Sequence, residues 1–327
     1  MRIARWTDGD QTREGIVVED AVVPFPDEVT VAGLLAAGLD AARAVHDRML
    51  TALAAGAARA TPLDEVALLA PLVPASIRDF VAFEEHVEGV SASVDGKSEV
   101  VPEWYEAPTF YFTNPHTVRA TGVVVPIPQT RRLDFELELA VIVGGVAGST
   151  GESLDVAGAA AHIFGYTVMN DWSARDLQSR EMKVRLGPAK GKDFGTTLGP
   201  WIVTADELDR YLDDEGLLAV RAEVYVGGTL VGEGLVSNMG WTFPELIAYA
   251  SRNSIVVPGD VLGSGTVGNG GCLGELWGRG VDIAALEPGD EVRMVIEGVG
   301  EIVNIVGERM PAPPLPPARP RPRARHR

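Results

Sequence analysis

The feature that most constrains this chain is a run of alternating polar and apolar residues between Asp134 and Val143. This alternation predicts a half-buried β-strand with one apolar face, made of Phe135, Leu137, Leu139, Val141 and Val143. Residues two apart share a strand face at a spacing of roughly 6.5–7 Å, so Glu136 and Glu138 should project side by side. Two such carboxylates repel unless a cation or a proton lies between them. The pair therefore indicates a site for a hard divalent cation such as Mg²⁺ or Ca²⁺.

Length and composition are typical of a soluble globular enzyme. The 327 residues are 46% apolar and 23% charged, which suits one large domain or one large and one small domain. The net charge of −18 argues against a nucleic-acid partner, because a phosphate backbone requires a basic surface. The single cysteine, Cys272, excludes an internal disulfide and fits a reducing compartment.

The hydropathy of the chain agrees with this class. The first residues lack the apolar segment of a signal peptide. No apolar run reaches the roughly 18–20 residues that a membrane span requires. We therefore expect a cytoplasmic protein that has no membrane partner.

Three segments of the chain differ in composition. Residues 1–68 join short β-like runs to an Ala- and Leu-rich stretch with helical periodicity, which predicts a small N-terminal α/β unit. Residues 69–310 are strand-rich, are punctuated by Gly and Pro, and hold every candidate chemical residue. Residues 311–327 form a Pro- and Arg-rich tail that cannot bury a core and is expected to be disordered.

Another acidic candidate, Asp79, lies seven residues before His86. On a helix this spacing places both side chains on one face, about 10 Å apart, which suits a metal ligand and a base serving one substrate. By itself the pattern is weak, because a solvated helix face, the commoner case, also explains the spacing. The other histidines have no candidate catalytic residue near them in the sequence, so we expect them to be structural or solvent-exposed: His46, His116, His162 and His326.

A strand-like apolar run ends at Asp171, and Ser173 is the expected N-cap of a following helix. Asp171 is accordingly either a metal ligand or a helix-capping acid. The Gly-rich loop that follows contains Lys190 and Lys192 but lacks the spacing of a nucleotide-binding loop. A lysine in this loop is expected to bind a substrate carboxylate or to stabilise a developing anion.

A second glycine loop ends at Glu275, which is flanked by apolar residues. Burial of this acid beside Leu276 and Trp277 would be costly without a partner. His86 is the natural partner, so we expect the two side chains to pair.

Together and in this order, these segments resemble the fumarylacetoacetate hydrolase superfamily over roughly residues 70–307. The motifs are Asp79 with His86, Glu136-Leu-Glu138, Asn170-Asp-Trp-Ser-Ala-Arg-Asp-Leu-Gln178, Gly191-Lys-Asp-Phe-Gly-Thr-Thr197, and Gly265-Thr with Gly274-Glu275. The resemblance implies an α+β fold with a β-rich core of mixed, rolled sheets behind the small N-terminal unit. It also implies a homodimer.

The resemblance further implies roles for single residues. The ligands of a divalent cation, Mg²⁺ or else Ca²⁺ or Mn²⁺, would be Asp79, Glu136, Glu138 and Asp171. Thr196 and Lys192 match positions that complete the cation's surroundings or touch substrate. His86, supported by Glu275, matches the general base that activates water. The matching substrate contacts are Tyr111, Gln178 and Thr266.

The implied activity is metal-dependent hydrolysis of a carbon–carbon bond in a small oxo-acid. The expected substrate is a β-diketo acid, either fumarylacetoacetate or an acylpyruvate, in aromatic catabolism such as tyrosine degradation. The alternatives are an isomerase, hydratase or decarboxylase of an unsaturated oxo-diacid on the same metal site, or a binding protein without catalysis. Val81 and Met182 stand where the family's hydrolase has substrate-contacting tyrosines, and an arginine expected after His86 has no clear counterpart.

Overall fold

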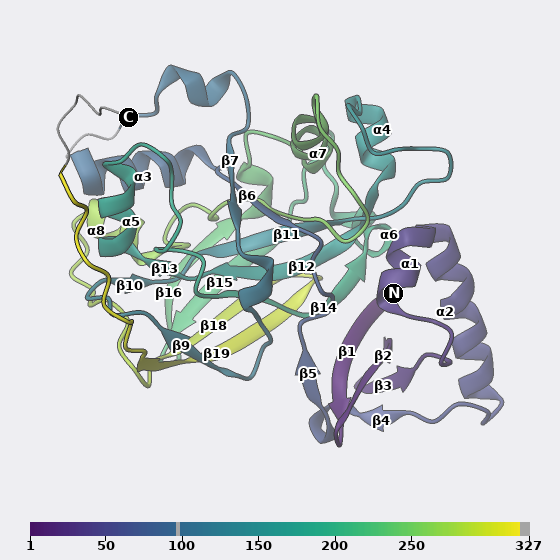
Figure 1. Cartoon of the computed structure of the whole chain (residues 1–327). Helices are drawn as coiled ribbons and strands as arrows, with labels where there is room; N and C mark the ends of the chain where they lie inside the picture. The colour runs from purple at the N-terminus through teal and green to yellow at the C-terminus, as the bar shows by residue number, and fades with distance from the viewer. Residues whose placement is uncertain (96–98, 321–327) are drawn as a thin grey trace, which may run out of the picture.

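The computed structural model describes residues 1–95 and 99–320 and is dominated by two mixed β-sheets (Figure 1). The larger sheet has the strand order β4-β3-β2-β1-β14-β12-β11-β17-β6-β7, with β5 beside β1 and β8 beside β14. The smaller has the order β16-β15-β18-β19-β9. Short helices lie around the sheets (Figure 1). The predicted α+β class with a β-rich core is confirmed.

The strands of the larger sheet are β1 (Arg2–Asp8), β2 (Gln11–Val18), β3 (Ala21–Pro24), β4 (Thr61–Pro62), β5 (Ala67–Leu69), β6 (Ile77–Phe80), β7 (Phe110–Thr113), β8 (Val118–Arg119), β11 (Leu137–Val143), β12 (Ile163–Asp171), β14 (Thr196–Thr204) and β17 (Val261–Gly263). The strands of the smaller sheet are β9 (Val124–Ile127), β15 (Arg221–Val226), β16 (Thr229–Leu235), β18 (Glu291–Ile296) and β19 (Gly300–Arg309). A separate two-stranded sheet pairs β10 (Leu133–Asp134) with β13 (Ser173–Ala174).

The helices fall into three groups in space (Figure 1). At one end of the larger sheet lie α1 (Val31–Ala37) and α2 (Leu39–Ala54), with α6 (Ala205–Leu208) beside α1; above the sheet lie α4 (Val156–Ala161) and α7 (Phe243–Ser251); and at the opposite end lie α3 (Glu84–Asp95), α5 (Arg175–Met182) and α8 (Leu273–Gly278). Short 3-10 helices span Leu63–Glu65, Pro102–Tyr105, Pro115–Thr117, Asp209–Tyr211 and Val236–Asn238. No helix in the described residues is long and apolar enough to cross a membrane.

The N-terminal unit continues the larger sheet directly. Strand β1 pairs with β14, so that Arg2 lies opposite Val203. The predicted helical stretch forms α1 and α2, which separate at Gly38, where φ is +88°. The predicted boundary near residue 68 falls within β5, which pairs with β1. The division into domains therefore stays a prediction, as does the disorder of the tail, of which residues 321–327 lie outside the described range.

Strand β11 is buried on both faces, so the prediction of a half-buried strand was wrong. One set of alternate residues, including Leu139 and Val141, packs in the core between the two sheets. The other set, including Ala140 and Ile142, packs in a second core under α1 and α2. The alternation in the sequence is real, but the second face is covered by the N-terminal helices. Glu138 consequently lies in the interior.

Two local predictions next to the site were also wrong. Asp79 and His86 do not share a helix: Asp79 is in β6, and His86 is in the first turn of α3. Ser173 is not the N-cap of α5, because it belongs to β13 and its hydroxyl donates to the carbonyl of Asp171. The N-cap position is held by Ala174, which makes no capping hydrogen bond through its side chain.

Candidate active site

Four buried carboxylates converge at the centre of the larger sheet. One oxygen from each of Asp79, Glu136, Glu138 and Asp171 lies within 4.8 Å of the others. Asp79 comes from β6, Glu138 from β11 and Asp171 from the last position of β12, while Glu136 immediately precedes β11. These are the four residues named as metal ligands by the sequence resemblance.

Strand register explains why residues so far apart in the sequence meet. Strand β6 runs parallel to β17, which places Asp79 opposite Gly263. Strand β17 in turn pairs with β11, which carries Glu138. A Cβ atom on Gly263 would lie 2.6 Å from Glu138 Oε2 and 2.7 Å from Asp79 Oδ1. Glycine at this position therefore leaves the space in which the two carboxylates approach each other.

Several buried oxygens of this group have no hydrogen-bond partner among the described residues. They are Asp79 Oδ1, Glu138 Oε1, Glu138 Oε2, Asp171 Oδ1 and Thr196 Oγ1. Thr196 faces the cluster from β14, where it is registered opposite Asp171. A buried polar atom without a partner costs about 1–3 kcal/mol. An all-oxygen set of unpartnered donors suits a hard divalent cation, so these residues fit the metal that the resemblance implies.

The electrostatics divide the four carboxylates into two kinds. Burial, followed by repulsion from a neighbouring acid, raises the pKa of Asp79 and of Glu138 well above the usual range. Burial also raises the pKa of Asp171, although Lys192 opposes it. Burial alone would raise the pKa of Glu136, but Lys192 and Arg175 together lower it. Glu136 is thus already compensated by protein cations, whereas Glu138 is not.

Lys192 lies inside the carboxylate cluster. Its ammonium donates to Asp171 Oδ2 at 2.6 Å and to Glu136 Oε2. The hydroxyl of Tyr111 donates to the same Asp171 oxygen at 2.5 Å. Burial lowers the pKa of Lys192, but the two acids raise it by more, so the side chain is a cation. Both residues hold Asp171 in place while they border the cavity described below.

His86 and Glu275 come close but do not form the pair that we expected. The carboxylate of Glu275 accepts from the amides of Asn269 at 2.8 Å and Gly270 at 3.1 Å, and it forms an ion pair with Arg279 at 2.5 Å. Within the described residues no hydrogen bond joins it to His86. The burial cost of this acid is therefore offset by a backbone loop and an arginine.

The neighbour of His86 is a residue that the sequence did not single out for chemistry. Its Nδ1 lies 3.8 Å from Cys272 Sγ, and donor atoms of His86, Cys272 and Glu275 all lie within 4.8 Å of one another. Burial lowers the pKa of His86 to about 4, although Glu136 opposes this shift. The imidazole is therefore neutral at neutral pH, with Nε2 free of protein partners among the described residues.

Sequence reasoning also missed a buried ion pair that joins the cluster to the Glu275 loop. Asp134 accepts from the amides of Leu273 at 2.7 Å and Gly274 at 2.9 Å, at the start of α8. The same carboxylate binds Arg175 at 2.7 Å, and Arg175 reaches Glu136 at 2.8 Å. The only local signal was the position of Asp134 at the head of the alternating run.

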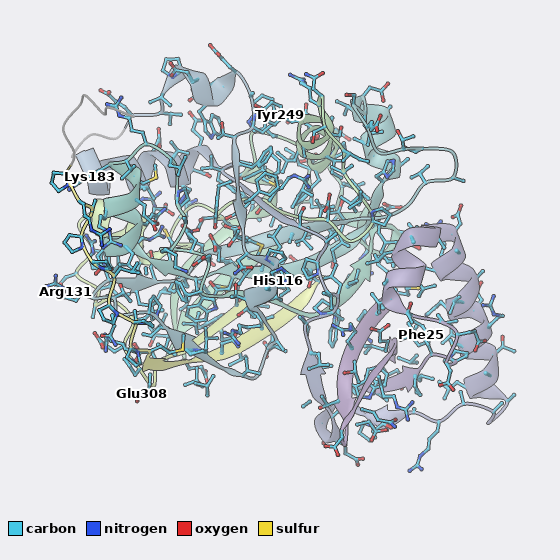
Figure 2. The ribbon with its side chains drawn as sticks, in the orientation of Figure 1. Phe25, His116, Arg131, Lys183, Tyr249 and Glu308 are labelled. Carbon is cyan, nitrogen blue, oxygen red and sulfur yellow. The ribbon has the colours of Figure 1, made fainter. Side chains whose placement is uncertain are left out.

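A cavity of ≈ 630 Å³ lies against the cluster. It is bordered by His86, Lys192 and the three expected substrate contacts, Tyr111, Gln178 and Thr266. Val81 and Met182 also line it. Its outer wall includes part of the segment after α5, where Lys183 lies at the edge of the molecule (Figure 2). The residues selected from sequence therefore share one cavity or lie directly behind it.

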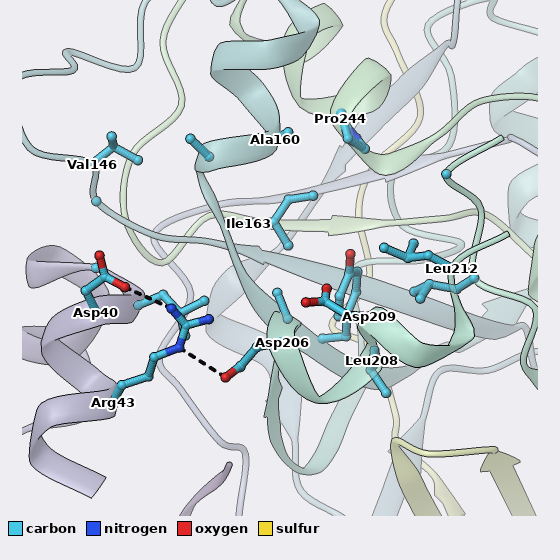
Figure 3. Close-up of a pocket in the computed structure, with 18 of the residues that line it drawn as sticks. Asp40, Arg43, Val146, Ala160, Ile163, Asp206, Leu208, Asp209, Leu212 and Pro244 are labelled. Atoms are coloured by element: carbon cyan, nitrogen blue, oxygen red, sulfur yellow. Dashed lines mark hydrogen bonds and ion pairs between the residues drawn. The ribbon is translucent and has the colours of Figure 1, made fainter. Parts of the chain in front are cut away.

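A larger cavity, of ≈ 770 Å³, lies where the N-terminal helices meet β12 and α6 (Figure 3). Arg43 of α2 crosses its rim and pairs with Asp40 at 2.9 Å and with Asp206 at 3.1 Å (Figure 3). None of the site residues predicted from sequence lines this cavity. Size alone therefore does not select the candidate site; the unpartnered acids and the neutral imidazole make the smaller cavity the candidate.

Comparison with known proteins identifies the family that this chain resembles. Residues 75–307 match the family model described as fumarylacetoacetate (FAA) hydrolase C-terminal. The chain is 30% identical over 309 residues to fumarylacetoacetase of Arabidopsis thaliana, which covers 77% of this chain and 73% of that protein. It is 32% identical over 273 residues to fumarylacetoacetase of Bos taurus, covering 69% and 65%.

Solved structures show the same fold. A fumarylacetoacetate hydrolase from psychrophilic Exiguobacterium antarcticum superposes with a TM-score of 0.68 at 25% identity, covering 94% of this chain and all of that one (100%). A maleylpyruvate hydrolase from Sphingobium sp. SYK-6, in complex with manganese(II) and pyruvate, gives a TM-score of 0.69 at 22% identity, covering 95% and 100%. The latter likeness concerns the fold alone.

Proposed function

Because the chain belongs to the fumarylacetoacetate hydrolase family, we propose that it is a divalent-metal-dependent hydrolase of a carbon–carbon bond in a β-diketo acid. The observation that carries this proposal is the group of buried, unpartnered carboxylate oxygens that borders the same cavity as a neutral histidine. Buried carboxylate oxygens without partners lower the stability of the fold unless a bound ligand compensates their charge. Fumarylacetoacetate and acylpyruvates are the candidate substrates.

The cation would be held by Asp79, Glu136, Glu138 and Asp171, with Thr196 beside it. Mg²⁺, Mn²⁺ and Ca²⁺ all accept such oxygen ligands. When bound, the ion supplies Lewis-acid stabilisation for the negative charge that develops on the substrate's oxygens. Glu136 enters this site already neutralised by Lys192 and Arg175, so the ion mainly compensates the other acids.

His86 would act as the general base. Its imidazole is neutral, and its Nε2 is available to a water molecule in the cavity because Nδ1 faces Cys272. The resulting imidazolium would be stabilised by the negative charges of Glu136 and of nearby Glu275. The low pKa of the buried ring helps it to pass this proton on in the next step.

The remaining residues would stabilise charge and orient the substrate. The water oxygen bonds to the distal carbonyl carbon, and Lys192 and Gln178 border the cavity where the resulting oxyanion forms. The carbon–carbon bond then breaks, and its electron pair remains with the fragment that leaves as an enolate. His86 then gives its proton to the carbon of the enolate that took part in the broken bond, so protons and electrons balance over the reaction. The products are one carboxylic acid, from the attacked acyl carbon, and one keto acid, from the enolate.

Two variants test this proposal. We expect His86→Ala and Asp171→Ala to lower kcat/KM for fumarylacetoacetate and acylpyruvates by at least about 10²-fold, because each removes a group that acts in the reaction. His116→Ala is the matched control, since His116 is an exposed histidine away from the cavity lining. Treatment with EDTA should abolish activity, and Mg²⁺ or Mn²⁺ should restore it. Near-wild-type hydrolysis by either site variant would refute the assignment.

A second reaction on the same site is favoured by one specific observation. Because Glu275 is bound by a loop and Arg279 rather than by His86, the histidine lacks a directly bonded carboxylate that would strengthen it as a base toward water. Isomerisation, hydration or decarboxylation of an unsaturated oxo-diacid would use the same acids. Product analysis by NMR distinguishes these reactions, since an intact carbon skeleton excludes hydrolytic cleavage.

From the resemblance noted in the sequence, we also propose that the chain forms a homodimer and works in the cytoplasm. Each chain has a mass of 34.7 kDa, so light scattering on the purified protein distinguishes a monomer from a dimer directly. A monomeric mass at micromolar concentration would contradict the dimer.

A further inference from the structure

We propose that the cavity selects β-diketo acids whose acyl end is apolar, in preference to diacids that carry a second carboxylate there. This inference rests on the function proposed above and narrows its candidate substrates to acylpyruvates with an apolar acyl group, because the fumaryl end of fumarylacetoacetate carries a second carboxylate. It follows from a contrast between two parts of the cavity. We call one part the floor, where the four carboxylates and Lys192 lie, and the other part the mouth. We define the mouth by six residues of the lining: Val81, Phe110, Phe112, Met182, Leu186 and Pro188.

These six residues are apolar, and the lining residues that lie between or beside them in the same segments are Phe80, Thr109, Tyr111 and Gly187. The six come from three separate segments: the end of β6, strand β7, and the end of α5 with the loop after it. A substrate whose metal-binding oxygens reach the floor must extend its other end between these segments. An apolar acyl group would remove both its own surface and theirs from water, which is favourable in proportion to the area covered.

Among the described residues, the lining of the cavity has no free cation for a second carboxylate. Among the described residues of the lining, Lys192 is the only lysine or arginine, and its ammonium already binds Asp171 and Glu136. Arg78 stacks on the outer wall, 5.1 Å from the ring of Phe112, but it pairs with Asp260 at 2.8 Å. A carboxylate placed in the mouth would lose water without gaining an ionic partner, which is unfavourable.

The cations that follow α5 in sequence do not change this balance. Lys183 and Arg185 are exposed and do not line the cavity. Lys183 lies at the periphery of the molecule beside α5 (Figure 2). Neither residue is part of the lining that the acyl end would contact, so the apolar surface remains the feature that a ligand meets.

Exposure supports the same conclusion independently. The side chains of Leu186, Phe112 and Met182 are 89%, 61% and 51% exposed, although large apolar residues are usually covered. Phe112 and Phe110 form an edge-to-face pair with centroids 5.5 Å apart, and Phe110 also packs on Phe80 at 5.0 Å. The aromatic wall is thus held by its own neighbours, and a ligand that covers it needs no rearrangement of the floor.

The test compares acyl groups of similar size on one 2,4-dioxo acid scaffold. We expect kcat/KM for hexanoylpyruvate and benzoylpyruvate to exceed that for succinylpyruvate by about tenfold or more, with Mg²⁺ present. Met182→Arg should reverse or cancel this ratio by adding a cation to the mouth. Val184→Arg is the matched control: it adds the same charge two residues away, at a site that is 74% exposed but outside the lining.

Three outcomes would overturn the inference. The first is a wild-type preference for succinylpyruvate, and the second is an unchanged ratio of kcat/KM values in a folded Met182→Arg variant. The third is an equal shift of this ratio in Val184→Arg, which would indicate a long-range electrostatic effect. Should Met182→Arg fail to fold, Leu186→Arg replaces it, because that side chain is the most exposed of the mouth. Light scattering on each variant checks that a changed subunit contact does not account for the shift.

The test also separates this inference from the proposed function. If none of the dioxo acids is cleaved, the proposed hydrolysis fails. Calorimetric binding of benzoylpyruvate and succinylpyruvate to the Mg²⁺-loaded protein then still measures the preference of the mouth. Equal affinity, or tighter binding of succinylpyruvate, would overturn the inference irrespective of the reaction catalysed.

Discussion

The floor and the mouth of the same cavity are built in opposite ways. The floor consists of charged residues on or next to central strands, and almost all of them are fully buried. The position of each is fixed either by the pairing of its strand with a neighbouring strand or by an ion pair. The mouth consists of apolar residues at strand ends and in a loop, and several are exposed. Buried charges must be compensated, so their positions are constrained by the whole fold. Exposed apolar side chains are constrained mainly by what binds them, so the mouth can differ between proteins that share a floor.

The largest expected effect comes from separating two acids of the floor. Glu138→Gln and Glu136→Gln should each lower metal-supported kcat/KM by about 10³-fold or more, because each removes a charged ligand. Their effects on the stability of the metal-free protein should have opposite signs. Glu138 forms no ion pair with a cation among the described residues, and its pKa is raised by burial and by Asp79, so its neutral replacement should stabilise the fold by about 1–2 kcal/mol. Glu136 compensates Lys192 and Arg175, so its replacement should destabilise the fold by about 3 kcal/mol.

Urea denaturation in EDTA measures both changes, and each variant serves as the control for the other. The two residues lie two positions apart and undergo the same chemical substitution, so the difference isolates their partners. Equal destabilisation by both variants would mean that Glu138 is compensated in the metal-free protein. The assignment of the unpartnered oxygens to a cation would then lose its basis.

The next effect tests the space within the floor. Gly263→Ala places a methyl group against the carboxylates of Glu138 and Asp79, whose ends must move apart. Because the ends of carboxylate side chains are flexible, they can move without destabilising the fold. We therefore expect the variant to bind Mg²⁺ about 10–100-fold more weakly, with little change in the free energy of unfolding. Gly195→Ala is the matched control, since a Cβ there meets its closest neighbour, Val125, at an ordinary 3.5 Å. Calorimetric titration with Mg²⁺ measures both, and unchanged affinity in Gly263→Ala would place the cation elsewhere.

Sequence predicted the floor better than its surroundings, and the reason is physical. The pair Glu136 and Glu138 follows from the period of a strand, and Asp171 from the end of an apolar run; both are local signals. Asp79 and Lys192 had only weak local signals, and the order and spacing of the motifs gave them roles at the metal site through the family resemblance. What local signals could not supply was pairing between distant strands. The parallel register of β6 on β17 joins Asp79 to a strand more than 180 residues away.

The same limit explains the errors and omissions. A spacing of seven residues fits one helix, but it fits equally a strand, a turn and a new helix, which is how Asp79 and His86 are arranged. Asp134 was missed because its amide partners in α8 are 139 and 140 residues away. Cys272 served only to exclude a disulfide, and nothing in its sequence neighbours indicated that it would face His86.

His86 lies between floor and mouth, and its burial predicts a smaller effect that depends on pH. The pKa is about 4 in the folded protein but close to 6.5 in an unfolded chain. The stability that follows from the neutral ring is fully present above pH 6.5 and is lost progressively as pH falls to 4. Between pH 7 and pH 5 this loss should amount to about 2 kcal/mol.

We expect His86→Gln, which cannot titrate, to show a shallower decline of unfolding free energy over this range than the wild type. Urea denaturation in EDTA at pH 5, 6 and 7 measures the difference. The acids of the floor titrate in both proteins, so their contribution cancels in the comparison. His116→Gln, at an exposed histidine, is the control. An identical pH dependence of wild type and His86→Gln would mean that the imidazole is accessible enough to protonate in the folded state.

The smallest effect is expected at the mouth, where Leu186→Ser should leave the fold unchanged. A side chain that is 89% exposed contributes little to packing, so the free energy of unfolding should change by no more than about 0.5 kcal/mol. Catalysis should respond only when the substrate reaches this residue: about three- to tenfold in kcat/KM for benzoylpyruvate, and hardly at all for acetylpyruvate. Val184→Ser should change neither value, since Val184 lies outside the lining. A large loss of stability in Leu186→Ser would show that the residue is packed like the floor, and the contrast between the two halves of the cavity would fail at that point.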